Sequence, residues 1–329
     1  MVGGRITIRL RWGKTRLMRL WPDCMHADVS KGHQLLRRTA MKIGFIGLGT
    51  MGGAMSANLI KKGFSVQGYD IAPEALERFE KAGGVPCSDM AAAAKGADIV
   101  FTMLPNGPHV EQAVEKIVGS MAKGALFVDC STILPEVTLR VGARLRAEGM
   151  RVMDAPVGRT GAEALLGKLL FMVGGEEKDL ALVRPCLECM GDTILHCGPL
   201  GSGIATKIVN NYMSITLNVL TAEALTLGEA LGLERDRLLE VLRGTPAGRG
   251  HINATYPGKV FKGDISASFM LDLANKDLGL AIEVADTKNV PLFTGGAARQ
   301  AYSLARARGY GRKDWTAMLE VVRQLSQAQ

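Results

Sequence analysis

The 329-residue sequence lacks an uninterrupted apolar run long enough to cross a bilayer. Its longest charge-free helical stretch, residues 208–222, contains three asparagines and a serine. That stretch is also shorter than the roughly 20 apolar residues that a spanning helix needs. Low-complexity tracts and internal repeats are absent as well. The sequence therefore predicts a protein without a membrane span, and its length is sufficient for two domains.

The sequence also lacks a strong charge outside its first 40 residues. The net charge is +8, but residues 1–40 hold nine Lys/Arg against two Asp, so the remaining chain carries only +1. Arginines interrupt every apolar run of residues 1–40, which excludes the apolar core of a signal peptide. We expect this extension to be disordered or not translated, with folding from Met41 onward. An organellar transit peptide and a basic arm that binds polyanions are the alternatives.

A second Cys-x-x-Cys pair is missing too. The six cysteines stand at positions 24, 87, 130, 186, 189 and 197, and only Cys186 and Cys189 have the spacing of a metal or redox pair. Three residues apart in an amphipathic stretch, they share one helix face. We therefore expect buried thiols, no metal site and a reducing, cytoplasmic location.

The first recognisable motif is a strand–helix–strand pattern that starts at residue 42. An apolar strand is followed by Gly47-x-Gly49-x-x-Gly52, a helical pattern and a second strand that ends in Asp70. In a dinucleotide-binding unit the first glycine permits the sharp turn, the second lets the backbone approach a pyrophosphate, and the third lets helix and strand pack closely. The exposed N–H groups of the helix then bind the pyrophosphate.

Asp70 follows the last glycine by 18 residues, where a carboxylate accepts hydrogen bonds from the adenosine ribose. The same carboxylate would repel a 2′-phosphate, and Tyr69, Ile71 and Ala72 provide no arginine to hold one. We therefore predict that the cofactor is NAD rather than NADP.

Further apolar strands at 97–105, 125–132 and 151–156 alternate with helical segments, which is typical of a doubly wound parallel sheet. Ligands bind at the carboxyl ends of such strands. The residues at these ends are therefore candidates for a common crevice: Met103, Leu104, Pro105, Asn106, Ser131, Thr132, Gly158, Arg159 and Thr160. The stretch DAPVGRTGAEA (154–164) places an arginine inside a tight turn, where its guanidinium could bind an anion. An ion pair with a surface carboxylate is the alternative.

The second half of the sequence is helical. Residues 203–233 read as one helix of about 30 residues, long by the standards of globular proteins. Its apolar character favours burial between domains or at a subunit contact, and thus a homodimer or homotetramer. Lys207, Asn210, Asn211 and Ser214 form one polar stripe by their i, i+3, i+4 and i+7 spacing. A lysine there could donate a proton to the alkoxide that hydride transfer to a carbonyl creates.

Four segments resemble the β-hydroxyacid dehydrogenases: FIGLGTMGGAMSAN (45–58), DAPVG (154–158), GSGIATKIVNN (201–211) and LDLANKDLGLA (271–281). The resemblance covers nearly all of residues 41–329. It implies an NAD-binding Rossmann domain at 41–200, followed by an all-helical domain at 201–329 built around a long interdomain helix. It also implies that Lys207 is the catalytic acid and base and that Lys276 lies near the nicotinamide. Further cofactor contacts are implied for Leu48, Thr50, Met51, Leu104 and Thr132.

Many members of that family that act on carboxylates have Ser-Gly-Gly in the turn where this sequence has Gly158-Arg159-Thr160. This variant resembles the sulfolactaldehyde reductases within the family. The resemblance implies that the turn and the Asn210, Asn211 and Ser214 stripe hold a sulfonate. The alternatives are a carboxylate substrate, such as 3-hydroxyisobutyrate, tartronate semialdehyde or succinic semialdehyde, and a non-catalytic binding module. We expect no nucleic acid or membrane partner, and we leave His251 and Trp315 without a chemical role.

Overall fold

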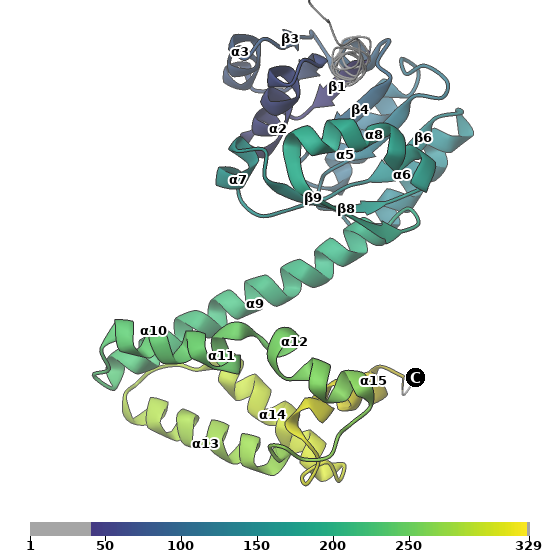
Figure 1. Ribbon diagram of the computed structural model, residues 1–329. Coiled ribbons are helices and arrows are strands. Elements are labelled where there is room, and N and C mark those ends of the chain that lie inside the picture. Colours follow the sequence, from purple (N-terminus) through teal and green to yellow (C-terminus); the bar gives the residue numbers. More distant parts are fainter. Residues whose placement is uncertain (1–40, 328–329) are drawn as a thin grey trace, which may run out of the picture. The chain divides into compact units, whose positions relative to one another are not determined.

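The computed structural model describes residues 41–327 and divides into two units, one ending at Asn210 and one beginning at Asn211 (Figure 1). The expectations for residues 1–40 lie outside the described residues. The predicted domain boundary at 200/201 lies just before helix α9 (Ser202–Ala230), whose first nine residues belong to unit 1. Each unit is described by itself below.

The core of unit 1 is a nine-stranded sheet with the order β3-β2-β1-β4-β5-β6-β8-β7, in which β9 pairs with β8. Strands β1 to β6 are mutually parallel. Their bounds are β1 Lys42–Ile46, β2 Ser65–Tyr69, β3 Val85–Pro86, β4 Ile99–Thr102, β5 Leu126–Asp129 and β6 Arg151–Asp154. The outer strands are β7 Val157–Gly158, β8 Leu169–Gly174 and β9 Gly191–Gly198.

Helices cover both faces of this sheet, because apolar side chains point alternately to either side of each strand. In β1, Phe45 packs on the layer of helices α2 Thr50–Lys61, α3 Pro73–Lys81 and α8 Glu177–Met190. The next residue, Ile46, packs on the opposite layer of α4 Met90–Ala94, α5 Gly107–Ile117 and α6 Pro135–Ala147. The predicted doubly wound sheet is therefore confirmed for β1 to β6.

The outer strands differ from the all-parallel expectation, because β8 runs antiparallel to both β6 and β7. A parallel connection needs a crossover of a dozen or more residues, usually a helix that spans the sheet. Between β7 and β8 the chain has only the five-residue helix α7 (Gly161–Leu165) and a short turn. The chain therefore reverses direction and returns beside the strand it has just left.

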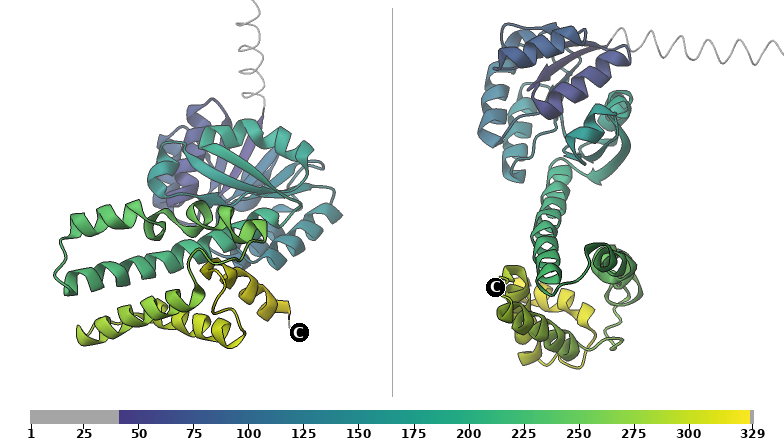
Figure 2. Two further views of the ribbon diagram at one scale, coloured as in Figure 1. Left: turned by 60° about the horizontal axis from the view of Figure 1, so that its bottom comes forward. Right: turned by 90° about the vertical axis from the view of Figure 1, so that its left-hand side faces the viewer.

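Unit 2 is helical, as expected, and its helices are visible from two sides in Figure 2. Besides most of α9 it contains α10 Arg235–Gly244, α11 Pro246–Arg249, α12 His251–Ala254, α13 Leu271–Thr287, α14 Phe293–Ala307 and α15 Met318–Gln327. Short 3₁₀ turns, η1 Tyr256–Gly258, η2 Val260–Lys262 and η3 Trp315–Ala317, connect them. The predicted long helix is confirmed, since α9 has 29 residues. Apolar side chains in its middle turns, such as Tyr212 at 74% exposure, are exposed in the single chain.

Two buried carboxylates connect segments of unit 2 through hydrogen bonds. Glu223 is buried and accepts hydrogen bonds at the start of α14, from Thr294 N at 2.8 Å and from the Thr294 hydroxyl. Asp314 is 1% exposed and accepts from Ser268 N and Thr316 N at 2.9 and 3.0 Å. Among residues 41–327, no helix is both long and apolar enough to cross a membrane.

Candidate active site

The turn between β1 and α2 has the geometry that a pyrophosphate requires. Gly47 has a φ of 92°, and a Cβ on it would lie 2.2 Å from the carbonyl oxygen of Met103. A Cβ on Gly52 would lie 1.9 Å from the carbonyl oxygen of Gly47. A Cβ on Gly49 would meet no atom within 4 Å, and no side chain caps α2 at this residue. The turn is therefore packed beneath Gly47 and Gly52 and open at Gly49, which fits a dinucleotide at the N-terminus of α2.

Asp70 lies beside this turn, at the end of β2. One carboxylate oxygen accepts a hydrogen bond from Leu48 N at 2.6 Å, and the other accepts from Ala72 N at 2.9 Å. Each oxygen has a second lone pair, so the carboxylate can also accept bonds from two ribose hydroxyls. The negative charge is unfavourable for a 2′-phosphate at the same place.

The ends of β4 and β5 are joined by hydrogen bonds around Asp129. Its carboxylate accepts from the Thr102 hydroxyl at 2.7 Å and from Ser131 N at 3.0 Å. Complete burial raises the pKa of Asp129 to about 6. The Ser131 hydroxyl accepts from Leu104 N at 2.9 Å, and Ser131 is only 2% exposed. The buried Ser131 hydroxyl fixes the Leu104 loop, and direct contact of Ser131 with the substrate stays a prediction.

The remaining predicted cofactor residues lie along the same edge of the sheet. Gly47 packs against the Met103 carbonyl, directly after β4. A Cβ on Gly161 would lie 3.4 Å from the methyl group of Thr50. The dinucleotide turn, the end of β4 and the turn after β7 are thus neighbours. The side chains with at least partial exposure on this edge are those of Thr50, Met51, Met103, Leu104, Pro105 and Thr132.

Arg159 stands in the turn that follows β7, next to the start of β9. Its Nη1 donates to Asp192 Oδ1 at 2.6 Å and to the carbonyl oxygen of Lys168, and its Nη2 donates to the Thr193 hydroxyl at 3.1 Å. The side chain is 35% exposed, so a ligand can reach it. The ion-pair alternative is therefore present in this structure, while anion binding by Arg159 stays a prediction.

The backbone of Arg159 is strained. Its φ is 75°, a left-handed conformation that glycine adopts freely and other residues rarely. In the described part of the chain, Asn289 is the one other non-glycine residue with a positive φ. Such a conformation costs on the order of 1–3 kcal/mol, persists where the surrounding structure holds it, and clusters at active sites and ligand clamps.

Thr160, the next residue, is held by a second carboxylate. The backbone N–H of Thr160 donates to Glu163 Oε2 at 3.0 Å, and its hydroxyl donates to the same oxygen. The bond from the Thr160 N–H is one half of a capping box at the start of α7, in which the Glu163 N–H donates in return to the Thr160 side chain. In the turn proposed to bind the anion, the Arg159 guanidinium therefore donates to the carboxylate of Asp192, and the Thr160 hydroxyl donates to the carboxylate of Glu163.

Lys207 lies on the second turn of α9, and Asp154 holds the first turn. The Asp154 carboxylate, at the end of β6, is 1% exposed and accepts from Gly201 N at 2.8 Å and Ile204 N at 2.7 Å. Burial raises the pKa of Asp154, although these bonds oppose the shift. Lys207 is half-buried, and desolvation lowers the pKa of its ammonium group. A lowered pKa suits a lysine that must give up a proton near neutral pH.

The rest of the polar stripe continues on α9 across the boundary of the units. Asn210 belongs to unit 1, and Asn211 and Ser214 belong to unit 2. Lys276 lies on α13 in unit 2 and forms an ion pair with Asp277 at 2.9 Å. Its predicted contact with the nicotinamide stays a prediction.

Two residues of undecided role also lie in unit 2. The His251 ring packs edge-on against Trp315, with ring centroids 4.7 Å apart, and its Nδ1 lies 2.9 Å from the Thr255 hydroxyl. Burial lowers the pKa of His251. These contacts give both aromatic residues a packing role at the start of α12.

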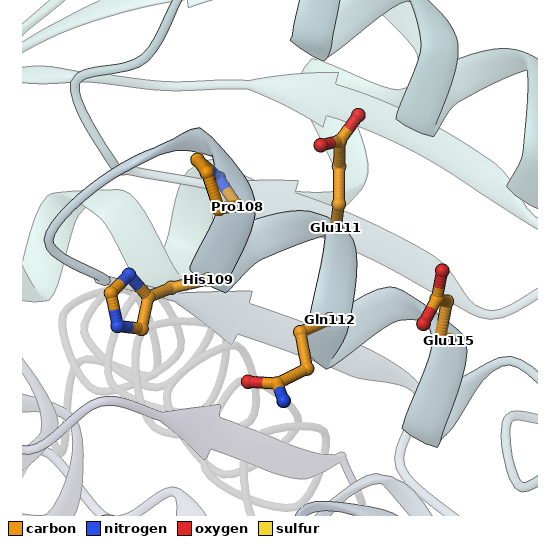
Figure 3. A pocket seen from close by; sticks show the side chains of 5 residues that line it. All are labelled: Pro108, His109, Glu111, Gln112 and Glu115. Atoms are coloured by element: carbon orange, nitrogen blue, oxygen red, sulfur yellow. The ribbon is translucent and has the colours of Figure 1, made fainter.

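Sequence reasoning missed four carboxylates of this region: Asp129, Asp154, Glu163 and Asp192. Local signals existed for three of them, since Asp129 and Asp154 end apolar strands and Glu163 has the Thr-x-x-Glu spacing of a capping box. Cys186 and Cys189 are buried on α8, as expected. A shallow hollow on α5, lined by Pro108 and four polar side chains, is drawn in Figure 3. It contains none of the predicted site residues, and we assign it no chemistry.

Comparisons with known proteins match both halves of the chain. Residues 42–198 match the sequence profile described as the NAD binding domain of 6-phosphogluconate dehydrogenase. Residues 201–322 match that described as NAD-binding of NADP-dependent 3-hydroxyisobutyrate dehydrogenase.

Individual relatives cover most of the chain. The 3-sulfolactaldehyde reductase of Escherichia coli (strain K12) is 44% identical over 284 residues, which is 85% of this chain and 95% of the relative. The NAD-dependent L-serine dehydrogenase of Pseudomonas aeruginosa is 37% identical over 84% of this chain and 95% of its own. Among solved structures, a Mycobacterium tuberculosis 3-hydroxyisobutyrate dehydrogenase with L-serine matches with a TM-score of 0.62 and 34% identity, over 86% of this chain and 99% of that chain.

Proposed function

The chain belongs to the β-hydroxyacid dehydrogenase family related to 3-hydroxyisobutyrate dehydrogenase, and from this membership we propose that it is a 3-sulfolactaldehyde reductase. It is an oxidoreductase that acts on CH–OH groups and uses a nicotinamide cofactor, so the alternative of a non-catalytic binding module does not hold. In the proposed reaction 3-sulfolactaldehyde is reduced reversibly to 2,3-dihydroxypropane-1-sulfonate, with NADH preferred over NADPH.

The observation that supports this substrate most is Arg159 in its strained turn. A guanidinium is a forked, permanently charged donor that suits a sulfonate. Arg159 keeps a left-handed backbone where glycine would be relaxed, which is the pattern expected of a residue retained for binding. The 44% identity to the Escherichia coli reductase points to the same substrate.

The chain's own residues divide the chemical work. Gly47, Gly49 and Gly52 bind the pyrophosphate, and Asp70 binds the ribose and disfavours a 2′-phosphate. The bound nicotinamide supplies the hydride. The Lys207 ammonium donates a proton to the carbonyl oxygen as negative charge develops on it, and the neutral amine removes that proton in the reverse direction. Asp154 holds the helix turn before Lys207.

A carboxylate substrate is the second candidate, because arginine binds carboxylate and sulfonate alike. The relatives that act on L-serine and 3-hydroxyisobutyrate favour it. Cytoplasmic location and a homodimeric or homotetrameric state belong to the proposal as well. So does direct contact of the substrate with the remaining predicted residues, Ser131, Gly158, Thr160, Asn210, Asn211 and Ser214.

Steady-state kinetics on a panel of aldehydes test the assignment. The panel holds 3-sulfolactaldehyde, tartronate semialdehyde and succinic semialdehyde, each with NADH and with NADPH. We expect the highest kcat/KM with the sulfonate and NADH. Equal or better efficiency with a carboxylate aldehyde would overturn the sulfonate assignment, and a preference for NADPH would overturn the role of Asp70.

Two variants test the residues. Lys207→Ala should lower kcat by roughly 10²–10⁴-fold and leave NADH binding unchanged, because a general acid contributes about that much. Arg159→Ala should lower kcat/KM by about 10–100-fold, the loss of one charge-assisted hydrogen bond of ~1.5–3 kcal/mol. Arg140→Ala is the matched control, since Arg140 also pairs with a surface carboxylate, Glu111, at 2.7 Å.

A further inference from the structure

The anion-binding turn assigned by the proposed function is surrounded by negative charge. Arg159 is paired with Asp192, and Thr160 is bonded to Glu163. We propose that Asp192 and Glu163 make this site selective for substrates whose terminal group carries one negative charge, and against dianions such as phosphate monoesters. This inference rests on the proposed function, because it takes the turn to be the place where the substrate's anion binds.

The contacts of Arg159 leave room for an anion. A guanidinium has five N–H donors. Three of them are used, by Asp192, Thr193 and the Lys168 carbonyl, with both donors of Nη1 occupied. Within the described chain, Nε and the second donor of Nη2 have no hydrogen bond. An oxyanion can take these two donors side by side while Asp192 and Lys168 keep the guanidinium in place.

The charges around the turn nearly cancel. Bonds from the Thr193 hydroxyl and then from Arg159 lower the pKa of Asp192, and bonds from Thr160 lower the pKa of Glu163. Both carboxylates are therefore ionised at neutral pH. They offset the charges of Arg159 and of Lys168, whose charge also acts on Asp192.

A near-neutral site discriminates by charge. A lone arginine would attract a dianion more strongly than a monoanion. Beside Asp192 and Glu163, the second charge of a phosphate gains little attraction and is repelled by two carboxylates. The two carboxylates disfavour the dianion relative to the monoanion in either case, whether the anion binds the open donors or displaces Asp192 from Nη1. Both carboxylates thus act as residues that determine specificity, without taking part in hydride transfer.

Two aldehydes with the same three-carbon skeleton test the inference. The ester oxygen that places the phosphate one atom farther from C3 is common to every variant, so the change in their ratio between variants reports the charge. 3-Sulfolactaldehyde and glyceraldehyde 3-phosphate are both three-carbon 2-hydroxyaldehydes, and at pH 8 the first carries one charge and the second two. The ratio of their kcat/KM values is measured for the wild type, Asp192→Asn and Glu163→Gln. Glutamine can keep the capping box, and asparagine can still accept from Arg159. Glu111→Gln removes the same charge from a distant ion pair and is the control.

We expect the preference for sulfonate over phosphate to fall on the order of tenfold in Asp192→Asn, the effect of one unit charge roughly 6 Å away at an intermediate dielectric. Glu163→Gln should change it in the same direction, and Glu111→Gln by less than about twofold. If phosphate turnover is too slow to measure, the inhibition constant of glycerol 3-phosphate gives the same comparison.

An unchanged ratio in both variants would overturn the inference. If the wild type prefers a carboxylate aldehyde, the proposed function fails, but that carboxylate is also a monoanion and replaces the sulfonate in the ratio. The two failures are therefore distinguishable. Thermal unfolding of each variant checks that it is folded, and a loss of fold in Asp192→Asn leaves Glu163→Gln to decide the outcome.

Discussion

Replacing Asp154 with asparagine tests how the catalytic lysine is positioned. One carboxylate oxygen accepts from the N–H of Gly201, just before α9, at 2.8 Å, and the other accepts from Ile204 N in the first turn of α9 at 2.7 Å. Asparagine keeps one acceptor and places an NH₂ group against an N–H donor. The carboxylate is packed close against Gly174, where a Cβ would lie 2.3 Å from Oδ1. At least one charge-assisted hydrogen bond of ~1.5–3 kcal/mol is lost, partly offset by relief of a buried charge.

We therefore expect Asp154→Asn to lower the free energy of unfolding by about 2 kcal/mol and to lower kcat through displacement of Lys207. The dissociation constant of NADH should not change, because the glycine turn and Asp70 do not contact Asp154. Denaturant unfolding followed by circular dichroism gives the first quantity, and steady-state kinetics and NADH fluorescence titration give the others.

Asp179→Asn is the matched control for this variant. Asp179 is also buried, at 3% exposure, and pairs with Arg151 at 3.1 Å, but it lies on α8 away from Lys207. The Asp179→Asn variant should be less stable than the wild type and should have an unchanged kcat. If Asp154→Asn loses stability and its kcat is no lower than that of Asp179→Asn, then Asp154 does not position Lys207, and the reasoning is wrong.

Two further predictions follow from the same edge of the sheet. The folded pKa of Asp129, about 6, exceeds its usual 3.8, so its contribution to stability is present at low pH and is lost as pH rises through that interval. Between pH 4 and pH 7 the free energy of unfolding of the wild type should therefore fall by about 2 kcal/mol relative to Asp129→Asn. Parallel profiles of the two proteins would contradict a buried, ionisable carboxylate at this position. Gly52→Ala should lose at least ~2 kcal/mol of stability because its Cβ meets a backbone oxygen, whereas Gly49→Ala should fold normally but bind NADH much more weakly. Titration of NADH into both variants measures this difference. Normal NADH binding by Gly49→Ala would contradict the close approach of the pyrophosphate to Gly49.

The sequence by itself determined the parts of this protein that depend on local pattern. The spacing of Gly47, Gly49 and Gly52 and the acid at Asp70 predict the dinucleotide turn, because strand, turn and helix are consecutive in the chain. The length of α9 follows from its uninterrupted helical pattern, and the polar stripe through Lys207 follows from the helical repeat.

Only the tertiary structure decided what surrounds those residues. Asp192 is 33 residues from Arg159, and Asp154 is 47 residues from Gly201, so no spacing in the sequence announces either contact. The antiparallel direction of β8 depends on the short connection between β7 and β8. Only the folded sheet shows where those two strands end and begin. Contacts between distant segments arise from packing, and packing is a property of the whole sheet rather than of any short stretch.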